Sequence, residues 1–180
     1  MVLKGDYPKT IIKKGDFNYA NEMVEFIKEN YFDINILVAA YPEKHPHSNC
    51  ISTDIDFFVN KVNAGADEAV TQYFYNIDAY LHFIEEVQKR NIDIPITPGI
   101  MPITNYDQLI YFSKTCGAEI PAWILNKLKL YKNDLNSLKE FGEDVVSEMC
   151  LKLKDNGVSS FHFYCLNKAE PTLSIVKKIT

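Results

Sequence analysis

The sequence lacks the features that mark several common protein classes. Its 180 residues include only four cysteines, at positions 50, 116, 150 and 165, and no C-x-x-C pair. None of its seven glycines builds the G-x-G-x-x-G fingerprint of dinucleotide-binding folds. No apolar run is long enough for a membrane span. These absences argue against a zinc site, a redox dithiol and a membrane anchor, and they favour a reducing, cytoplasmic setting.

A concentrated basic surface is also missing. Lysine and arginine number 19 against 24 acidic residues, which gives a net charge of −5, and the lysine pairs at 13–14 and 177–178 are isolated. This balance excludes a protein that holds nucleic acid by electrostatics. What is present is a hydrophobic content of 47%, ordinary for a globular protein. We therefore expect one folded domain over residues 1–180.

Strand-like apolar runs alternate with helical patterns along the chain. The strand-like runs cover 1–3, 34–40, 68–72, 94–100 and 158–164. Helical spacing predicts helices at 21–28, 51–62, 78–89, around 109–113, after Pro121 and at 135–154, the last ending at Gly157. We expect the segment Ser52–Asp54 and the residue Asp78 to cap the second and third helices.

This alternation predicts a parallel sheet with right-handed crossovers. Strand starts near 36, 68 and 94 have the spacing of βαβ units. Length alone favours an open, flavodoxin-like sheet, because a complete eight-stranded barrel usually needs ~250 residues. The first run begins at residue 1, so we expect that the domain is cut at its N-terminal side.

Residues capable of chemistry follow each strand-like run. In parallel α/β folds the ligand site is built from the loops after the strands, so these residues predict an active-site rim. Thr71-Gln72 and His162-Phe163-Tyr164 also place polar groups inside runs that should be buried, where they must face a site or find partners. The groups on the rim are Gly5-Asp6, the segment 41–45, Gln72, Pro98-Gly99 and Asn167-Lys168.

Each of these residues has a structural alternative. Gly5-Asp6 can be a simple turn. Gln72 can bind a heterocycle through its amide or be satisfied by backbone groups. His45 and His47 lack a third ligand at a recognisable spacing, so we predict no metal and favour contact with a planar ligand. Taken alone, Phe112 reads as core and Lys168 as a solvated charge.

Several motifs, in this order and spacing, closely resemble the methylenetetrahydrofolate reductase family over nearly the whole chain. They are Gly5-Asp6, AAYPEKHP at 39–46, NAGAD at 63–67, TQYF at 71–74, PGIMP at 98–102 and HFYCLNK at 162–168. The resemblance implies a flavin-containing (β/α)8 TIM barrel, of which this chain holds strands 4 to 8 with their helices. The family's proton-donating glutamate lies on the first barrel strand, before the part represented here.

The resemblance also implies an activity. In this family NADH or NADPH passes a hydride to FAD, and the flavin then reduces 5,10-methylenetetrahydrofolate to 5-methyltetrahydrofolate, which supplies methionine synthesis. Members are often dimers or tetramers, so a homo-oligomer is consistent with the resemblance. The residues do not choose between NADH and NADPH. The alternative function is a non-catalytic partial barrel that binds flavin or folate.

Site residues follow from the same resemblance. Asp6 is implied as the catalytic carboxylate near the flavin and pterin, where it would tune the flavin and stabilise a cationic folate intermediate. The implied cofactor-binding residues are Lys4, Gly5, Asp6, Ala20, Tyr41, His45, Asp54 and Lys61, with Lys61 as the cation for phosphate. The implied substrate-binding residues are Gln72, Gln108, Phe112 and Lys168.

Overall fold

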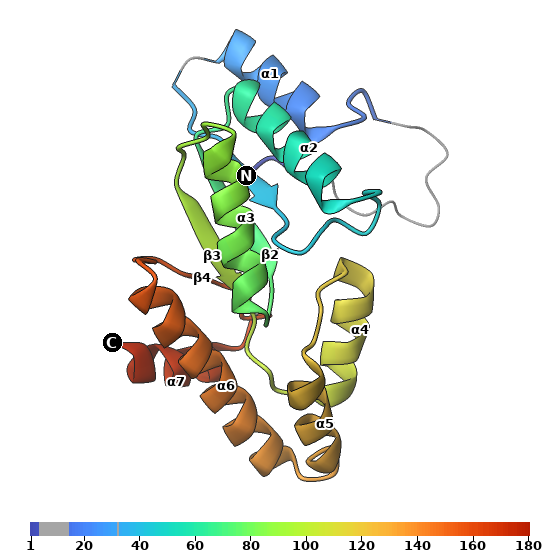
Figure 1. Cartoon of the computed structure of the whole chain (residues 1–180), viewed down its shortest axis with the longest axis vertical. Coiled ribbons are helices and arrows are strands. Elements are labelled where there is room, and N and C mark those ends of the chain that lie inside the picture. Colours follow the sequence, from blue (N-terminus) through green and yellow to red (C-terminus); the bar gives the residue numbers. More distant parts are fainter. Residues whose placement is uncertain (4–14, 32) are drawn as a thin grey trace.

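The computed structural model describes residues 1–3, 15–31 and 33–180 (Figure 1). Across these residues a parallel sheet has the order β1-β2-β3-β4. Its strands are β1 (Leu37–Ala40), β2 (Glu68–Tyr73), β3 (Ile96–Ile100) and β4 (His162–Phe163). Val2 adds an isolated parallel bridge to Val38 on the other edge of β1. The predicted parallel alternation is confirmed.

The spatial order of the strands follows their order in the chain. A flavodoxin-like sheet would contain a reversal of strand order at its switch point, and none occurs among the described strands. The sheet is therefore singly wound, as in a barrel, and the open-sheet alternative suggested by length is wrong. Strands β1, β3 and β4 are shorter than predicted, whereas β2 ends one residue later than predicted, at Tyr73. The run 158–164 yields only His162–Phe163, because an exposed edge strand with one neighbour forms few ladder bonds.

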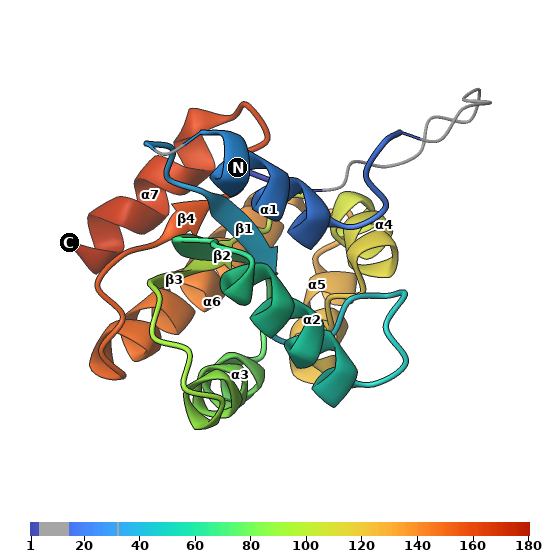
Figure 2. The same ribbon diagram turned by 90° about the horizontal axis from the view of Figure 1, so that it is seen from above.

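Helices surround the sheet, as the two views in Figures 1 and 2 show. The predicted helices are confirmed, whereas the last helix follows Lys168 and was not predicted. It buries Ile175 and Ile179, a four-residue spacing typical of an amphipathic helix. The helices are α1 (Ala20–Asn30), α2 (Ile51–Asn63), α3 (Ile77–Lys89), α4 (Tyr106–Cys116), α5 (Ala122–Leu130), α6 (Leu135–Asp155) and α7 (Ala169–Ile179).

Both expected caps prove wrong. Helix α2 begins at Ile51 with Cys50 as N-cap, so Ser52–Asp54 lie inside its first turn, where their side chains cannot cap it. In α3 the cap is Asn76, whose side-chain oxygen accepts from the backbone N–H of Asp78 at 3.1 Å. The expected C-terminal glycine of α6 is confirmed, since Gly157 has a φ of +89°.

The core divides into two apolar clusters. One joins α1, α2 and α3 to β1 and includes Val24, Val38, Phe58 and Phe83. The other joins the ends of β2 and β3 to the C-terminal helices and is the larger. Each fully buried aliphatic or aromatic side chain stabilises the fold by roughly 1.5–3 kcal/mol. In Figure 1, α1 and α2 accordingly lie toward one end of the molecule and α4 to α7 toward the other.

One polar side chain from each of the two strand interruptions pairs with a backbone group of another strand. The buried hydroxyl of Thr71 accepts from the backbone N–H of Gly99 at 2.9 Å, and the hydroxyl of Tyr164 donates to the carbonyl oxygen of Thr71 at 2.9 Å. A Cβ on Gly99 would stand 2.1 Å from that carbonyl oxygen and 2.6 Å from the Tyr164 ring. This Thr71–Gly99–Tyr164 contact holds β2, β3 and the end of β4 together where the rim begins.

Candidate functional site

Three cavities follow the carboxyl ends of the strands. The first lies beside the end of β1 and has a volume of about 600 Å³. The second lies between the loop after β1 and the end of β2, and the third lies between β3, α6 and the start of α7, with a volume of about 470 Å³. All three thus lie on the side of the sheet where the sequence placed the active-site rim.

The first cavity brings together the described residues expected to bind the cofactor. Tyr41 follows β1 directly, His45 belongs to the same loop, and Ala20 opens α1. Asp54 and Lys61 come from α2, two turns apart on one helix. Residues that lie 41 positions apart in the sequence therefore line one space.

Asp54 fixes the loop that carries His45. One carboxylate oxygen accepts from the buried Ser48 hydroxyl at 2.6 Å, and the other accepts from the backbone N–H of His45 at 3.0 Å. The ring of His45 packs edge-on against Tyr41, with 4.7 Å between centroids. Asp54 is 8% exposed, so its contacts serve mainly to order the loop. The cavity wall is consequently preformed.

The protonation of His45 follows from its contacts. Its Nδ1 accepts from the backbone N–H of His47 at 3.1 Å, which leaves Nε2 to carry the proton of the neutral ring. Burial lowers the pKa of His45, and the charge of Asp54 opposes this shift only in part. His45 is therefore a neutral donor at the cavity, suited to an acceptor on a planar or sugar-like ligand.

Lys61 supplies the positive charge of the first cavity. Its Nζ donates to the carbonyl oxygen of Ala39, and the Phe58 ring lies 5.6 Å from the same nitrogen. Burial lowers the pKa of Lys61 to about 8, although the nearby Asp54 carboxylate acts in the opposite direction. A cation desolvated to this degree gains strongly from an anionic ligand. The donor set of this cavity thus fits a phosphate group.

The second cavity places Gln72 beside the same loop. It is lined by Tyr41, Glu43, Gln72 and Tyr73 together with the turn after α4. The Gln72 side-chain oxygen accepts from the backbone N–H of Tyr73 at 3.0 Å, so the backbone satisfies half of the amide. Its amide nitrogen has no hydrogen-bond partner in the described part of the chain. Gln72 therefore keeps a donor for a ligand.

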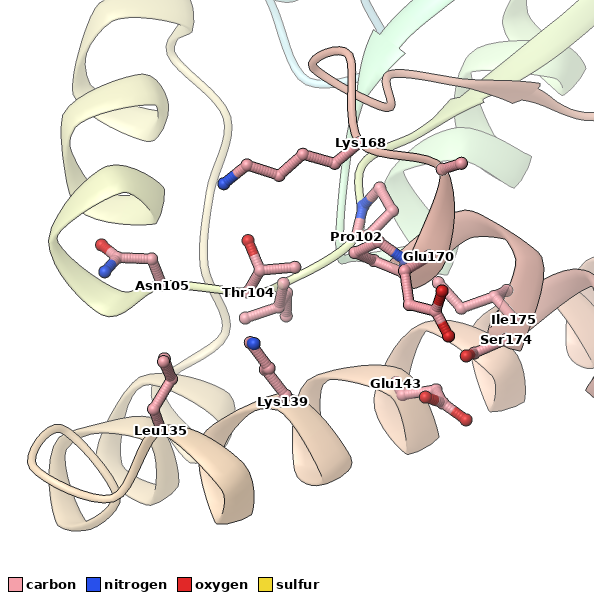
Figure 3. A pocket seen from close by; sticks show the side chains of 13 residues that line it. Pro102, Thr104, Asn105, Leu135, Lys139, Glu143, Lys168, Glu170, Ser174 and Ile175 are labelled. Carbon is pink, nitrogen blue, oxygen red and sulfur yellow. The ribbon is translucent and has the colours of Figure 1, made fainter.

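Lys168 lines the third cavity, as Figure 3 shows. Its side chain reaches from the start of α7 toward the beginning of α4, while Lys139 points upward from α6. Both lysines are exposed, and neither forms an ion pair within the described ranges 1–3, 15–31 and 33–180. This cavity offers mobile positive charge rather than a preformed site.

The other predicted residues fall elsewhere. Phe112 is partly buried and packs against the larger core cluster. Gln108 lies in the first turn of α4, where its backbone N–H donates to the capping oxygen of Asn105. Neither lines any of the three cavities. Lys4, Gly5 and Asp6 lie outside the described residues.

Sequence reasoning did not anticipate Lys139 or the particular contact of Glu43 near these cavities. Lys139 lies near the N-terminal end of α6 and belongs to no motif, so no sequence signal distinguishes it from other surface lysines. Glu43 belongs to the segment AAYPEKHP at 39–46, but nothing in its sequence neighbours indicates that it contacts the backbone of residue 119. Within the described residues, no group of three metal-ligating side chains is found, and no helix is long and apolar enough to cross a membrane.

Comparison with known proteins shows which family this chain matches. Residues 1–180 match the family described as methylenetetrahydrofolate reductase. A 5,10-methylenetetrahydrofolate reductase from Buchnera aphidicola of Acyrthosiphon pisum is 39% identical and covers 96% of this chain. That of Escherichia coli K12 is 36% identical over 97% of the chain. Methylenetetrahydrofolate reductase 2 of Saccharomyces cerevisiae is 33% identical over 99%.

The chain is shorter than these relatives. It spans 56% of the Buchnera protein, 58% of the Escherichia coli protein and 31% of the yeast protein. Among solved structures, an uncharacterised Clostridium thermocellum protein that binds two copies of 5-methyl-5,6,7,8-tetrahydrofolic acid aligns with a TM-score of 0.60. It covers 88% of this chain, and the chain covers 57% of it, at 20% identity. This likeness supports the fold, a partial TIM barrel.

Proposed function

The chain belongs to the methylenetetrahydrofolate reductase family, and from this premise we propose that it forms the flavin and folate side of such an enzyme. The proposed reaction reduces 5,10-methylenetetrahydrofolate to 5-methyltetrahydrofolate with NADH or NADPH through bound FAD, in the cytoplasm. Because the chain covers little more than half of its bacterial relatives, the activity is proposed for the complete protein.

One observation carries the cofactor proposal. The five described residues that the resemblance assigned to the cofactor line a single cavity of about 600 Å³. That cavity contains a partly buried lysine and a neutral histidine donor, a combination that suits a diphosphate and a polar chain. Bound FAD would supply the two-electron transfer between nicotinamide and folate.

The chain's own residues would then bind and orient. Lys61 would hold the phosphate charge, and Tyr41 and His45 would line the path toward the end of β1. Gln72, at the end of β2, would offer its free amide nitrogen to the pterin or the nicotinamide. Lys168 would attract the carboxylates of folate from the third cavity. Asp6 remains the proposed carboxylate near the flavin and pterin.

The first experiment is a flavin-retention assay. The purified protein is mixed with FAD and desalted, and its visible spectrum is recorded before and after anaerobic addition of NADH or NADPH. Retained flavin that bleaches supports the proposal, and the faster nucleotide identifies the donor. Retained flavin that neither nucleotide bleaches favours the non-catalytic binding protein instead. The matched variants are Lys61→Met, which should lose flavin, and Lys129→Met, which removes an exposed lysine of α5 and should retain it.

A further inference from the structure

Glu43 has an unusual environment for a carboxyl group in a loop. Its Oε2 accepts from the backbone N–H of Glu119 at 2.8 Å, although the two residues lie 76 positions apart. Its Oε1 is buried and has no hydrogen-bond partner among the residues that the structure describes. Buried polar atoms are nearly always paired, so an unpaired carboxyl oxygen calls for an explanation.

The loop also approaches the end of α4 through the residues that follow Glu43. Gly117 ends α4 with a φ of +76°, and a Cβ placed on it would stand 3.0 Å from Cγ of Pro46. The carbonyl oxygen of Lys44 would lie 3.5 Å from the same point. Lys44 itself has a φ of +146°, a conformation that side chains rarely adopt. The loop is thus held against the end of α4 in a strained form.

We propose that Glu43 is a positioning residue that, as a neutral carboxylic acid, couples the loop carrying Tyr41 and His45 to the end of α4. The loop forms one wall of the first cavity, and Glu43 with the turn after α4 forms the second. Ionisation of Glu43 would loosen the contact between them. The inference rests on the proposed function, because its consequence is that the wall of the first cavity, and with it FAD affinity, changes with pH.

The surroundings favour the neutral acid. Burial raises the pKa of Glu43 to about 7, the Glu119 carboxylate acts in the same direction, and the hydrogen bond from the Glu119 amide opposes both. The shared cavity has a volume of about 10 Å³, which leaves little room for water around a carboxylate. The titratable groups that face Glu43 are Tyr41 and Lys44 on the loop, Tyr73 on β2, and Cys116 and Glu119 at the end of α4.

Two of the groups facing Glu43, Lys44 and Tyr73, are engaged elsewhere. Lys44 directs its Nζ to the carbonyl oxygen of Ser48 at 2.7 Å, on the far side of the loop. Tyr73 shares a hydrogen bond with Ser113, and burial raises the pKa of Tyr73 to about 12. The tyrosine therefore stays neutral through the range in which Glu43 titrates. Glu43, whose pKa is about 7, changes its charge around neutral pH at this contact.

The test compares native protein with Glu43→Gln, which keeps the shape and the neutral state of the acid at every pH. FAD affinity is measured for both at about pH 6 and about pH 8.5, on either side of the titration. We expect equal affinities at the lower pH and an affinity about fivefold weaker for native protein at the higher pH. Using the ratio of the two proteins cancels the contributions of Lys61 and His45 to the pH dependence.

A second readout does not need flavin. Hydrogen exchange of the peptide 116–121 is compared between native protein and Glu43→Gln at the same two pH values, so that intrinsic exchange rates cancel. Native protein should lose protection relative to the variant as the pH rises. Glu119→Gln keeps the amide donor and removes the neighbouring charge, so it should shift the native transition to lower pH. Glu140→Gln, an exposed change on α6, should leave the transition unchanged.

The outcomes separate this inference from the proposed function. If FAD binds equally at both pH values in native protein and Glu43→Gln, and exchange shows no pH-dependent difference, the inference is overturned while the proposed function stands. If FAD does not bind at all, the proposed function fails, and the exchange data alone decide whether Glu43 couples the loop to α4. An unshifted transition in Glu119→Gln would also count against the inference.

Discussion

The first and third cavities are built in opposite ways. The cavity beside β1 has a buried Asp54 with both oxygens engaged, a fixed neutral His45 and a partly buried Lys61. The cavity beside α7 has exposed lysines, with no ion pair at Lys139 or Lys168 in the part of the chain that the structure describes. A preformed wall suits a ligand that stays bound, whereas mobile charges suit ligands that come and go. This difference is what the proposed function, with a resident cofactor and exchanging substrates, would require.

The largest effect is expected from a substitution that damages both regions at once. Gly99→Ala would place a Cβ 2.1 Å from the carbonyl oxygen of Thr71, at the contact that joins β2 to the end of β4. We expect a loss of about 3 kcal/mol or more in the free energy of unfolding. Urea denaturation measures it, with Gly15→Ala as the control, because no atom of the described residues lies within 4 Å of a Cβ at that position. Equal stability of the two variants would contradict the prediction.

Asp54→Ala should damage the first cavity alone. The Ser48 hydroxyl and the His45 amide would lose their acceptor, which costs about 2–4 kcal/mol for two unsatisfied donors. FAD affinity should fall with stability, while folate affinity should change less. Denaturation and flavin titration measure the two effects. Asp56→Asn, on the exposed face of α2, is the control and should leave flavin binding unchanged. A folate defect as large as the flavin defect would argue against two separately built cavities.

The charge of Lys61 should make FAD affinity at the first cavity depend on pH. Its pKa of about 8 should rise when a phosphate binds, so the complex holds more protons than the free protein above that pH. FAD affinity should therefore fall as the pH rises beyond about 8, approaching tenfold for each unit. Lys61→Arg keeps its charge throughout this range and should flatten the profile. A native profile that is already flat between pH ~7.5 and ~10 would contradict the role of Lys61.

The smallest effect is expected at the third cavity. Lys168→Ala should raise the KM for folate about threefold to tenfold and leave flavin retention unchanged, because an exposed cation contributes about 1 kcal/mol. Steady-state kinetics at two salt concentrations would measure it, and salt should shrink the difference between native protein and variant. Lys177→Ala, at the other end of the same helix, is the matched control. A flavin defect in Lys168→Ala would blur the distinction between the two cavities.

Periodicity predicted the elements of the fold well, because helices and buried strands leave repeating apolar patterns. Their ends were less predictable. Asp54 had the appearance of a cap, yet it turns toward the loop at 45–48. The contact between Tyr164 and Thr71 spans 93 positions, and only three-dimensional structure brings the two together. The polar anomalies indicated that such partners had to exist, but not which residues they were.

Residue spacing alone predicted less of the candidate site than of the fold. Ala20, Tyr41 and Lys61 carry no common motif, and they were singled out by a family resemblance; the structure then placed them around one cavity. Gln108 and Phe112 came from the same resemblance and lie outside the three cavities. Glu43 could not be interpreted from its neighbours, because its environment depends on a backbone amide 76 positions away.

The span of the Tyr164–Thr71 contact also has a consequence for the order of folding. Neighbouring strands β1 and β2 pair over a short stretch of chain, whereas four helices and β3 separate the end of β4 from β2 in the sequence. Closing the longer loop loses more chain entropy, so contacts of this kind form late. We expect the wall of the first cavity to be assembled before β4 arrives, and the third cavity, which needs the start of α7, to be completed last.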